Sequence, residues 1–315
     1  MERLVDAGIR SELLDRRQRL KLASETLPDR GQIIELLREV DLALERVSDG
    51  SYGLCESCHD TIEEDLLKSD PLARFCIDHL TPKEQQALQQ DLDLAARVQG
   101  ELLPRRGLRT DGWDVSYHYE PLGPVSGDYC DVLQSDDSFF FVLGDVSGKG
   151  VAASMLMAHL HAIFRSLATD RIPLDKLVER ANRVFCESTL SYHYATLVCG
   201  RAFKSGETEV VNAGHLPGLV LTKHCVKTLE ATGLPVGIFC SGEYSVAKLK
   251  LEPGDSLLLY TDGLSEARDH ADQEYGTERL SALFAGSGGD SSDRIIESCL
   301  KDLGNFRMAT PAQTT

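Results

Sequence analysis

The segment FFFVLGDVSGKG, residues 139–150, is the most informative stretch of this sequence. It starts as an apolar strand, reaches Asp145 and continues into a glycine-rich turn. The following residues, VAASMLMAHLHAIFRSLA, have apolar side chains at helical spacing, so the unit is predicted to be strand, tight turn and helix. The turn looks like a Walker A loop, but the spacing is one residue short and Gly150 replaces the Ser or Thr after Lys149. A carboxylate at the end of a rigid strand can instead bind a hard metal ion.

Two further acidic turns extend this prediction. Asp128 begins a short strand after Ser126 and Gly127, and Asp262 follows the strand SLLLY. Carboxylates beside glycine-rich turns suit an oxygen-ligated Mg²⁺ or Mn²⁺ site. Any one of these aspartates alone would be ordinary turn chemistry. The set of three predicts a metal centre.

Five motifs carry a resemblance to a known family. In order, they are GDYCDV, GDVSGKG, VNAGHLPGLVL, GLPVGIF and LEPGDSLLLYTDGLSEARD. Together they closely resemble the PPM-type (protein phosphatase 2C-like) serine/threonine phosphatases of the SpoIIE/RsbU class, over roughly residues 95 to 306. In that class two Mn²⁺ or Mg²⁺ ions lie between two β-sheets and activate the water that attacks a phosphoserine or phosphothreonine.

The resemblance implies roles for particular residues. Asp128, Asp145 and Asp262 would be the catalytic metal ligands, and the Val146 carbonyl would be a further ligand. Paired divalent ions activate water, so no protein nucleophile is required. No G-x-S-x-G nucleophile motif is present in the sequence.

Three histidines are candidates for additional site residues. His159 and His161 are two residues apart on a predicted helix and face different directions, which favours structural roles. His215, in the NAGH turn, could either approach the phosphate or cap the turn.

A second metal pattern lies near the N-terminus. Cys55, Cys58, Cys76 and His79 have the spacing C-x2-C-x17-C-x2-H, which predicts one tetrahedral, structural Zn²⁺ site. His59 is a weaker substitute ligand. The segment DGSYGLCESCHDTI resembles the DksA/TraR-type zinc finger, but His79 stands where that family has a fourth cysteine. In that family the finger and its helical hairpin contact RNA polymerase.

Helices are predicted on both sides of the finger. Residues 33–47 carry a coiled-coil-like apolar stripe, and SELLDRRQRLKLASETL would form its partner in a hairpin closed near residues 28–31. A linker helix follows Thr81, with Leu88, Leu92, Ala95 and Leu102 on one face and Gln99 as the polar member of that face. This helix either packs against its own domain or mediates homodimerisation and signal transmission.

The order of predicted elements gives an α+β fold. We expect an α-β-β-α sandwich phosphatase domain and an N-terminal helical zinc-finger module. The expected domains are the hairpin and finger (1–80), the linker helix (81–104) and the phosphatase domain (105–315). Predicted strands cover 113–120, 128–134, 138–145, 194–203, 207–213, 217–222, 244–250 and 256–261, and predicted helices cover 149–168, 174–190, 276–285 and 291–302.

The C-terminus departs from the resembled pattern. In the family, an Asp-Asp-x-Thr motif and a closing strand follow the last helix, whereas this sequence ends FRMATPAQTT. We therefore expect the last strand to be lacking, the second ion to be weak, activity to be low or absent, and stability to be reduced.

Composition limits the choice of function. The formal net charge of −17 argues against general nucleic-acid binding, and no signal peptide or membrane-spanning run is evident, so a cytoplasmic protein is expected. Its nine cysteines would then be mostly reduced or metal-bound.

The function expected from these patterns is metal-dependent protein serine/threonine phosphatase activity. By resemblance, the substrate would be a phosphorylated anti-sigma-factor antagonist in bacterial partner-switching signalling. The alternatives are a noncatalytic or weakly active phosphatase-fold regulator, and a zinc-finger module that contacts the transcription apparatus.

Overall fold

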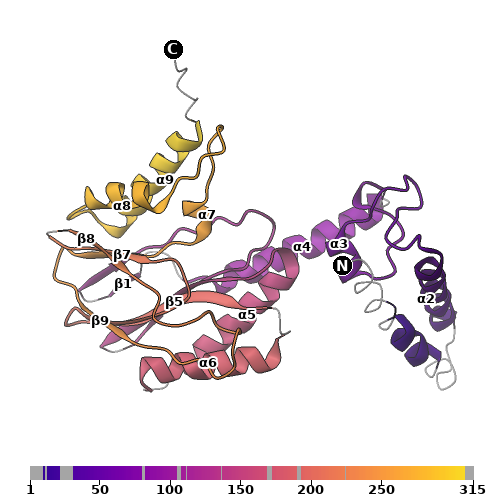
Figure 1. The fold of residues 1–315 in the computed structure, drawn as a ribbon, viewed down its shortest axis with the longest axis horizontal. Helices are drawn as coiled ribbons and strands as arrows, with labels where there is room; N and C mark the ends of the chain where they lie inside the picture. The colour runs from indigo at the N-terminus through magenta and orange to yellow at the C-terminus, as the bar shows by residue number, and fades with distance from the viewer. Residues whose placement is uncertain are drawn as a thin grey trace, which may run out of the picture. The chain divides into compact units, whose positions relative to one another are not determined.

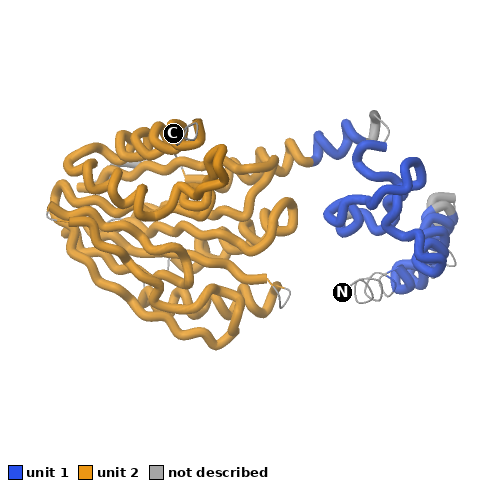
Figure 2. The backbone as a smooth tube through the Cα atoms, turned by 45° about the horizontal axis from the view of Figure 1, so that its top comes forward, with its two compact units in different colours: residues 1–91 blue, residues 92–315 orange. Residues whose placement is uncertain are grey.

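The computed structural model contains two compact units, residues 1–91 and residues 92–315 (Figure 2). It describes residues 10, 13–21, 31–79, 82–104, 108–110, 112–135, 137–168, 172–189, 193–223 and 225–308.

The first unit begins with the predicted helical hairpin. Residues 13–21 are helical, and the second helix is α2 (Gly31–Asp49). Leu13 and Val40 are both buried, and the Arg17 guanidinium lies 2.6 Å from the Asp41 carboxylate. The apolar stripe of α2 therefore has a buried centre, as its spacing predicted. The turn expected near residues 28–31 lies largely outside the described residues.

The finger follows α2 and contains little regular structure. A single β-bridge joins Leu54 to Thr61, and Ile62 is buried with two of the cysteines, Cys55 and Cys76. The remaining elements of the finger are the short helix α3 (Glu64–Ser69) and the 3-10 turn η1 (Ile77–His79). A module with so small an apolar core depends on additional links to hold its shape.

Helix α4 (Pro82–Leu102) corresponds to the predicted linker helix. Gln99 on this helix is buried, and Leu102 packs against the main core of the second unit. Leu94 and Val98, four residues apart, are more than half exposed. The helix therefore has one face packed on its domain and a separate apolar face in solvent.

The second unit is built around a five-stranded antiparallel sheet. Its strand order is β3-β4-β5-β6-β9, and neighbouring strands pair in antiparallel register. The strands are β3 (Asp128–Gln134), β4 (Ser138–Val146), β5 (Ala195–Phe203), β6 (Glu207–Ala213) and β9 (Ala247–Lys250). Side chains of β4 alternate between two cores: Phe140 and Val142 lie in one, Phe139 and Phe141 in the other.

Two helices cover one face of this sheet, as Figure 1 shows. They are α5 (Gly150–Leu167) and α6 (Leu174–Ser188). Apolar side chains of α5 recur at helical spacing, including Met157, Leu160 and Phe164, and all three are buried against the sheet.

The other face of the sheet packs against a second, smaller sheet. Its order is β10-β7-β8, and a separate pair, β1-β2, contributes Trp113 and Val115 to the core between the sheets. These strands are β1 (Leu108–Thr110), β2 (Trp113–Val115), β7 (Gly218–Leu221), β8 (Val226–Leu229) and β10 (Ser256–Leu258).

Helices α8 (Thr277–Ala285) and α9 (Ser292–Met308) cover the outer side of the smaller sheet (Figure 1). Leu219 and Leu221 of β7 pack into one cluster with Leu280 and Phe284 of α8. The order of layers is therefore helix, sheet, sheet, helix, and the predicted α-β-β-α sandwich is confirmed.

Several predicted boundaries differ from the structure. The strand expected at 113–120 ends at Val115, the last helix continues to Met308, and both β8 and the short helix α7 (Asp262–Ser265) were not predicted. Strand β8 was missed because two of its four side chains are exposed and give no apolar pattern. The segment 309–315, where the closing strand was expected to be lacking, lies outside the described residues.

The cysteines are mostly free, as expected, with one exception. Cys186 on α6 and Cys240 form a disulfide across a sequence separation of 54 residues, and the other seven cysteines are free thiols. The Asn182 side chain lies one helical turn before Cys186 and binds the same loop, accepting from Gly237 N–H and donating to the Phe239 carbonyl. No helix in the described residues is both long and apolar enough to span a membrane.

Candidate metal centres

Two of the three predicted aspartates are direct neighbours in the large sheet. Asp128, the first residue of β3, is the cross-strand partner of Asp145, the penultimate residue of β4. Side chains of directly opposed residues lie on the same face of an antiparallel pair, and two carboxylates in this arrangement repel each other. This pairing therefore favours a cation between them.

A glycine allows the preceding turn to approach β4 closely. A methyl group at Gly127 would lie 2.8 Å from the Val146 carbonyl oxygen and 3.2 Å from Oδ1 of Asp145. The Val146 N–H donates to the Gly127 carbonyl at 3.3 Å, which ties the turn to the end of the strand. The absence of a side chain at this position leaves space beside two of the predicted oxygen ligands.

Asp262 comes from the other half of the sandwich and lies near the same pair. Burial raises the pKa of Asp128, hydrogen bonds from Ser126 and Thr261 oppose the rise, and the Asp262 carboxylate adds to it. Burial, followed by repulsion from Asp128 and Asp262, raises the pKa of Asp145 to about 7. The structure thus brings the three predicted aspartates into one electrostatic group.

The donor set suits hard divalent ions. Three carboxylates and a backbone carbonyl are the ligand types that Mg²⁺ and Mn²⁺ prefer. Among the described residues, only the cysteine/histidine group of the finger has all its ligand atoms within 4.8 Å of one another. The carboxylate oxygens of Asp128, Asp145 and Asp262 do not form such a close group in this structure.

A buried glutamine holds the turn that carries Asp128. Gln99 Nε2 donates to the Ser126 carbonyl at 2.6 Å, and Gln99 Oε1 accepts from Ser126 N–H at 3.0 Å and from the Tyr119 hydroxyl at 3.2 Å. The Ser126 hydroxyl in turn donates to Asp128 Oδ2 and accepts from Asp128 N–H, both at 3.0 Å. These contacts connect α4 to the acidic centre; the sequence indicated only that Gln99 was the polar member of an apolar face.

The three histidines make local polar contacts. His159 Nε2 pairs with the Ser188 hydroxyl at 2.8 Å, and His161 lies 3.6 Å from the buried carboxylate of Asp131. His215 is buried, and its backbone N–H donates to Asn212 Oδ1 at 2.8 Å, which is a turn contact.

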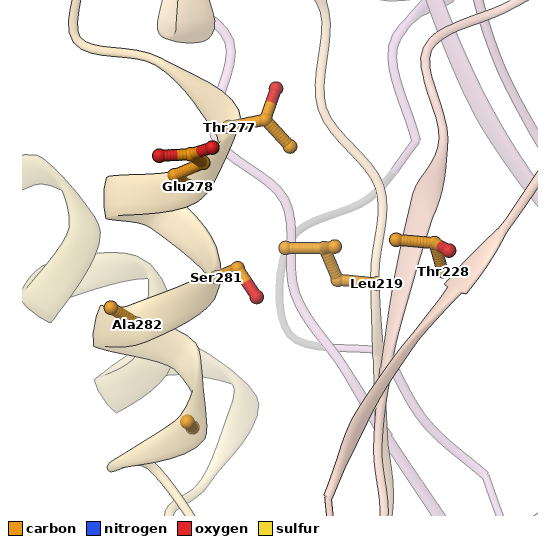
Figure 3. Close-up of a pocket in the computed structure, with 7 residues that line it drawn as sticks. Leu219, Thr228, Thr277, Glu278, Ser281 and Ala282 are labelled. Carbon is orange, nitrogen blue, oxygen red and sulfur yellow. The ribbon is translucent and has the colours of Figure 1, made fainter.

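A pocket of about 450 Å³ lies elsewhere in the second unit. Figure 3 shows its lining side chains on α8 and on strands β7 and β8; they include Leu219, Thr228, Thr277, Glu278 and Ser281. None of the three aspartates is among the residues that line it. The pocket offers a single carboxylate, so it is a poorer candidate for a metal centre.

The finger places its four predicted ligands together. Ligand atoms of Cys55, Cys58, Cys76 and His79 all lie within 4.8 Å of one another. The Cys58 and Cys76 sulfurs are 3.8 Å apart, which matches the edge of a tetrahedron with metal–sulfur bonds of about 2.3 Å. Burial acts to raise the pKa of Cys55, but backbone N–H groups around its sulfur lower it to about 6. Burial and the neighbouring cysteines raise the pKa of Cys76 to about 11, so Cys55 is the thiol of this pair that ionises more readily without metal.

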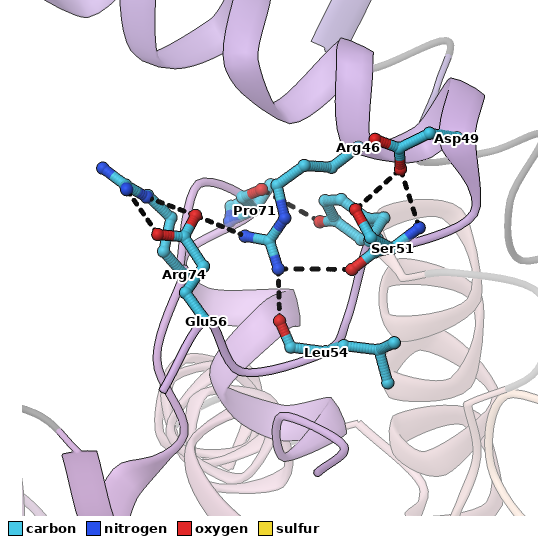
Figure 4. A network of polar contacts seen from close by, with 8 residues as sticks. Arg46, Asp49, Ser51, Leu54, Glu56, Pro71 and Arg74 are labelled. Atoms are coloured by element: carbon cyan, nitrogen blue, oxygen red, sulfur yellow. Dashed lines mark hydrogen bonds and ion pairs between the residues drawn. The ribbon is translucent and has the colours of Figure 1, made fainter. Parts of the chain in front are cut away.

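A polar network fixes the finger to the end of α2 (Figure 4). The Arg46 guanidinium donates to the carbonyls of Ser51 and Leu54 and lies 3.5 Å from Glu56. Glu56 also accepts from Arg74, whose Nε is 2.7 Å away. This network connects the segment of the first ligand pair, Cys55 and Cys58, to the residues just before the second pair, Cys76 and His79.

The layered sandwich is the fold of phosphatase 2C-type domains, and comparison with known proteins specifies the family. Residues 135–313 match the model of the family described as Stage II sporulation protein E (SpoIIE), and the chain belongs to that family. Residues 50–78 match the prokaryotic DksA/TraR C4-type zinc finger. His79 is one residue beyond the second match and replaces the fourth cysteine of a C4 site.

Curated relatives share the phosphatase region. The chain is 28% identical over 220 residues to Protein IcfG of Synechocystis sp. and 27% identical over 187 residues to phosphoserine phosphatase RsbU of Bacillus subtilis. These alignments cover 60% and 58% of this chain, but only 35% and 56% of the relatives. The chain thus spans about a third to a half of the length of these proteins.

Solved structures show the same fold. The SiaA-PP2C domain of Pseudomonas aeruginosa superimposes with a TM-score of 0.61 at 16% identity, covering 74% of this chain and 96% of that chain. The phosphatase domain of SpoIIE from Bacillus subtilis, with a fragment of its regulatory domain, gives a TM-score of 0.51 at 19% identity, covering 59% and 55%.

Proposed function

We propose that this chain is a metal-dependent phosphoserine/phosphothreonine protein phosphatase. The observation that carries the proposal is the grouping of Asp128, Asp145 and Asp262 at one end of the sandwich, where burial and mutual repulsion raise the pKa of two of them. Such a group is electrostatically unfavourable without a cation. Two relatives are named phosphoserine phosphatases, which supports an enzyme rather than a noncatalytic regulator.

The three aspartates and the Val146 carbonyl would hold two Mn²⁺ or Mg²⁺ ions. When bound, such ions lower the pKa of a water molecule and neutralise charge on the phosphoryl oxygens. The protein's contribution is to fix its oxygen ligands. The Ser126 hydroxyl orients one carboxylate oxygen of Asp128, and the pairing of β3 with β4 fixes the separation of Asp128 from Asp145.

The substrate class is a phosphorylated regulatory protein. A protein of a partner-switching pathway, such as a phosphorylated anti-sigma-factor antagonist, would present a phosphoserine or phosphothreonine on a folded surface. We base this on the relatives RsbU and RsbP, which are named phosphoserine phosphatases. The metal ions, rather than basic side chains, would attract the phosphate to this acidic protein.

The direct test is hydrolysis of a phosphoserine peptide by the purified full chain over a range of Mn²⁺ concentrations. We expect Mn²⁺-dependent turnover that Asp145→Asn reduces at least a hundredfold, because a neutral amide replaces an anionic ligand. Asp128→Asn and Asp262→Asn should act in the same direction. Asp137→Asn, an exposed aspartate in the β3–β4 turn, is the matched control. Equal turnover of all three variants and the parent would refute the site assignment.

The finger is proposed to hold one structural Zn²⁺ through Cys55, Cys58, Cys76 and His79. Four protein ligands complete a tetrahedral site and leave no position for a substrate. Ligand proximity supports the proposal. Elemental analysis of freshly purified protein should give one zinc per chain, and a value near zero would refute it.

We further propose three functional parts, namely the hairpin and finger (1–80), the linker helix (81–104) and the phosphatase domain (105–315). Exposed Leu94 and Val98 on α4 support a role for this helix in homodimerisation, because residues four apart form one stripe on a helix. Light scattering should show a dimer that Leu94→Glu with Val98→Glu converts to a monomer. A monomeric parent protein would exclude this role.

A further inference from the structure

The turn between β6 and β7 carries His215, a buried histidine whose ring contacts residues near two of the aspartates. Gly214 has a φ of +68°, and a methyl group at this position would lie 2.5 Å from the Pro235 ring. Only glycine accommodates both the left-handed backbone and this close approach without strain. The turn directs His215 into the protein, where only 6% of its surface is exposed.

Both ring nitrogens of His215 have defined partners. Nδ1 lies 2.9 Å from the Thr196 hydroxyl, and Nε2 lies 3.1 Å from the Tyr260 carbonyl oxygen. A carbonyl can only accept, so Nε2 carries the hydrogen. Burial lowers the pKa of His215, which favours the neutral ring, and Nδ1 then accepts from Thr196. The neutral ring therefore donates a hydrogen bond from Nε2 and accepts one at Nδ1, and each bond has a defined protein partner.

The two partners of the ring belong to the two halves of the sandwich. Thr196 on β5 is the cross-strand partner of Asp145 on β4. Tyr260 follows β10 and precedes Asp262, the first residue of α7, by two positions. The His215 ring therefore links the segment beside one proposed ligand to the segment that carries another.

We propose that His215 is a positioning residue that sets the separation between Asp145 and Asp262, through the Thr196 hydroxyl and the Tyr260 carbonyl. This inference rests on the proposed function, because it concerns the same metal centre. Divalent-ion sites need their ligands at defined distances. If the separation between the Asp145 and Asp262 carboxylates becomes variable, ion binding is weakened. In this role the ring acts through Thr196 and Tyr260 and transfers no proton.

A purely structural role makes a different prediction. If His215 only fills space in the core, an apolar side chain at this position should change stability alone. If the ring positions the ligands, its hydrogen-bonding groups matter, so His215→Gln should retain much of the function that His215→Leu loses. Thr196→Val provides an independent test, because it removes the hydroxyl while keeping the shape of the side chain.

The experiment measures Mn²⁺ binding to the purified full chain by titration calorimetry, at a temperature where circular dichroism shows every variant folded. His215→Leu and Thr196→Val should raise the dissociation constant for Mn²⁺ at least tenfold, and His215→Gln less than threefold. Phe139→Leu, in the core between the sheets and at the end of β4 remote from Asp145, should unfold at a lower temperature with unchanged Mn²⁺ affinity. This variant controls for lost stability.

Hydrolysis of an aryl phosphate gives a second measurement. His215→Leu should require at least tenfold more Mn²⁺ for half-maximal activity, while kcat at saturating Mn²⁺ stays within threefold of the parent value. Unchanged Mn²⁺ affinity in His215→Leu, with only a lower unfolding temperature, would overturn the inference. If the binding changes are observed but the parent hydrolyses no phosphoester, the positioning role stands and the proposed phosphatase function fails.

Discussion

The side-chain amide of Gln99 forms two hydrogen bonds with the backbone of Ser126, one to its carbonyl at 2.6 Å and one from its N–H at 3.0 Å. Gln99 belongs to α4, the linker helix, whereas Ser126 directly contacts the carboxylate of Asp128. The helix is thus joined to the proposed metal centre by a short series of hydrogen bonds.

Replacing Gln99 should affect both stability and metal dependence. In Gln99→Ala the two backbone groups of Ser126 lose their partner, and we expect the free energy of unfolding to fall by about 1–3 kcal/mol. The Mn²⁺ concentration for half-maximal activity should rise several-fold, because the turn that carries Asp128 is less constrained. Urea denaturation and Mn²⁺ titration measure the two effects. Gln90→Ala, on an exposed position of α4, is the control, and identical behaviour of the two variants would contradict the prediction.

Metal-free protein should be stabilised by removing one carboxylate from the centre. The folded-state pKa of Asp145 is raised to about 7, so its ionised form destabilises the fold above the ordinary carboxyl pKa. After allowance for solvent screening, Asp145→Asn should raise the free energy of unfolding at pH 8 in chelator by about 1–2 kcal/mol.

This gain should shrink as the pH falls from 7 towards 4, because the folded-state carboxyl of the parent then takes up a proton and no longer repels its neighbours. Added Mn²⁺ should reverse the order and make the parent the more stable protein. Thermal unfolding with and without Mn²⁺ measures both effects. A variant less stable than the parent in chelator at pH 8 would contradict the repulsion argument.

Loss of zinc should unfold the finger and leave the second unit folded. The finger's core contains only three fully buried side chains, so the proposed ion supplies most of its stability. With chelator or in Cys76→Ser, backbone amides in residues 51–79 should lose protection from hydrogen exchange, while those of β4 and β5 keep it. Cys225→Ser, an exposed free cysteine, is the control. Retained protection in zinc-free protein would show that the finger folds without metal.

The disulfide should stabilise the second unit. In the loop-entropy model, closing a loop across a sequence separation of 54 residues raises the free energy of the unfolded chain by about 4 kcal/mol. Cys186→Ser with Cys240→Ser should lower the free energy of unfolding by this order, as measured by urea denaturation. The Asn182 contacts to the same loop remain, so Mn²⁺ affinity should stay unchanged. A loss below about 1 kcal/mol would indicate that the disulfide adds little.

Local patterns in the sequence were sufficient for the main elements. The apolar run before Asp145 and the helical spacing after Gly150 predicted β4 and α5 closely, because strand and helix periodicities are properties of a short segment. The spacing of the finger ligands likewise predicted their grouping, since each pair lies on one tight turn. Elements without periodicity were missed, such as the four-residue helix α7.

The sequence by itself therefore determined the strand-turn-helix unit, the layered fold and the ligand pairs of the finger. Only the tertiary structure decided three further meetings of distant residues: Gln99 on Ser126, the His215 ring between two sheets, and Cys186 bonded to Cys240. The physical reason is that these contacts depend on strand register and on the packing of layers. Both arise from many weak interactions between segments far apart in the chain, and no short stretch of sequence contains them.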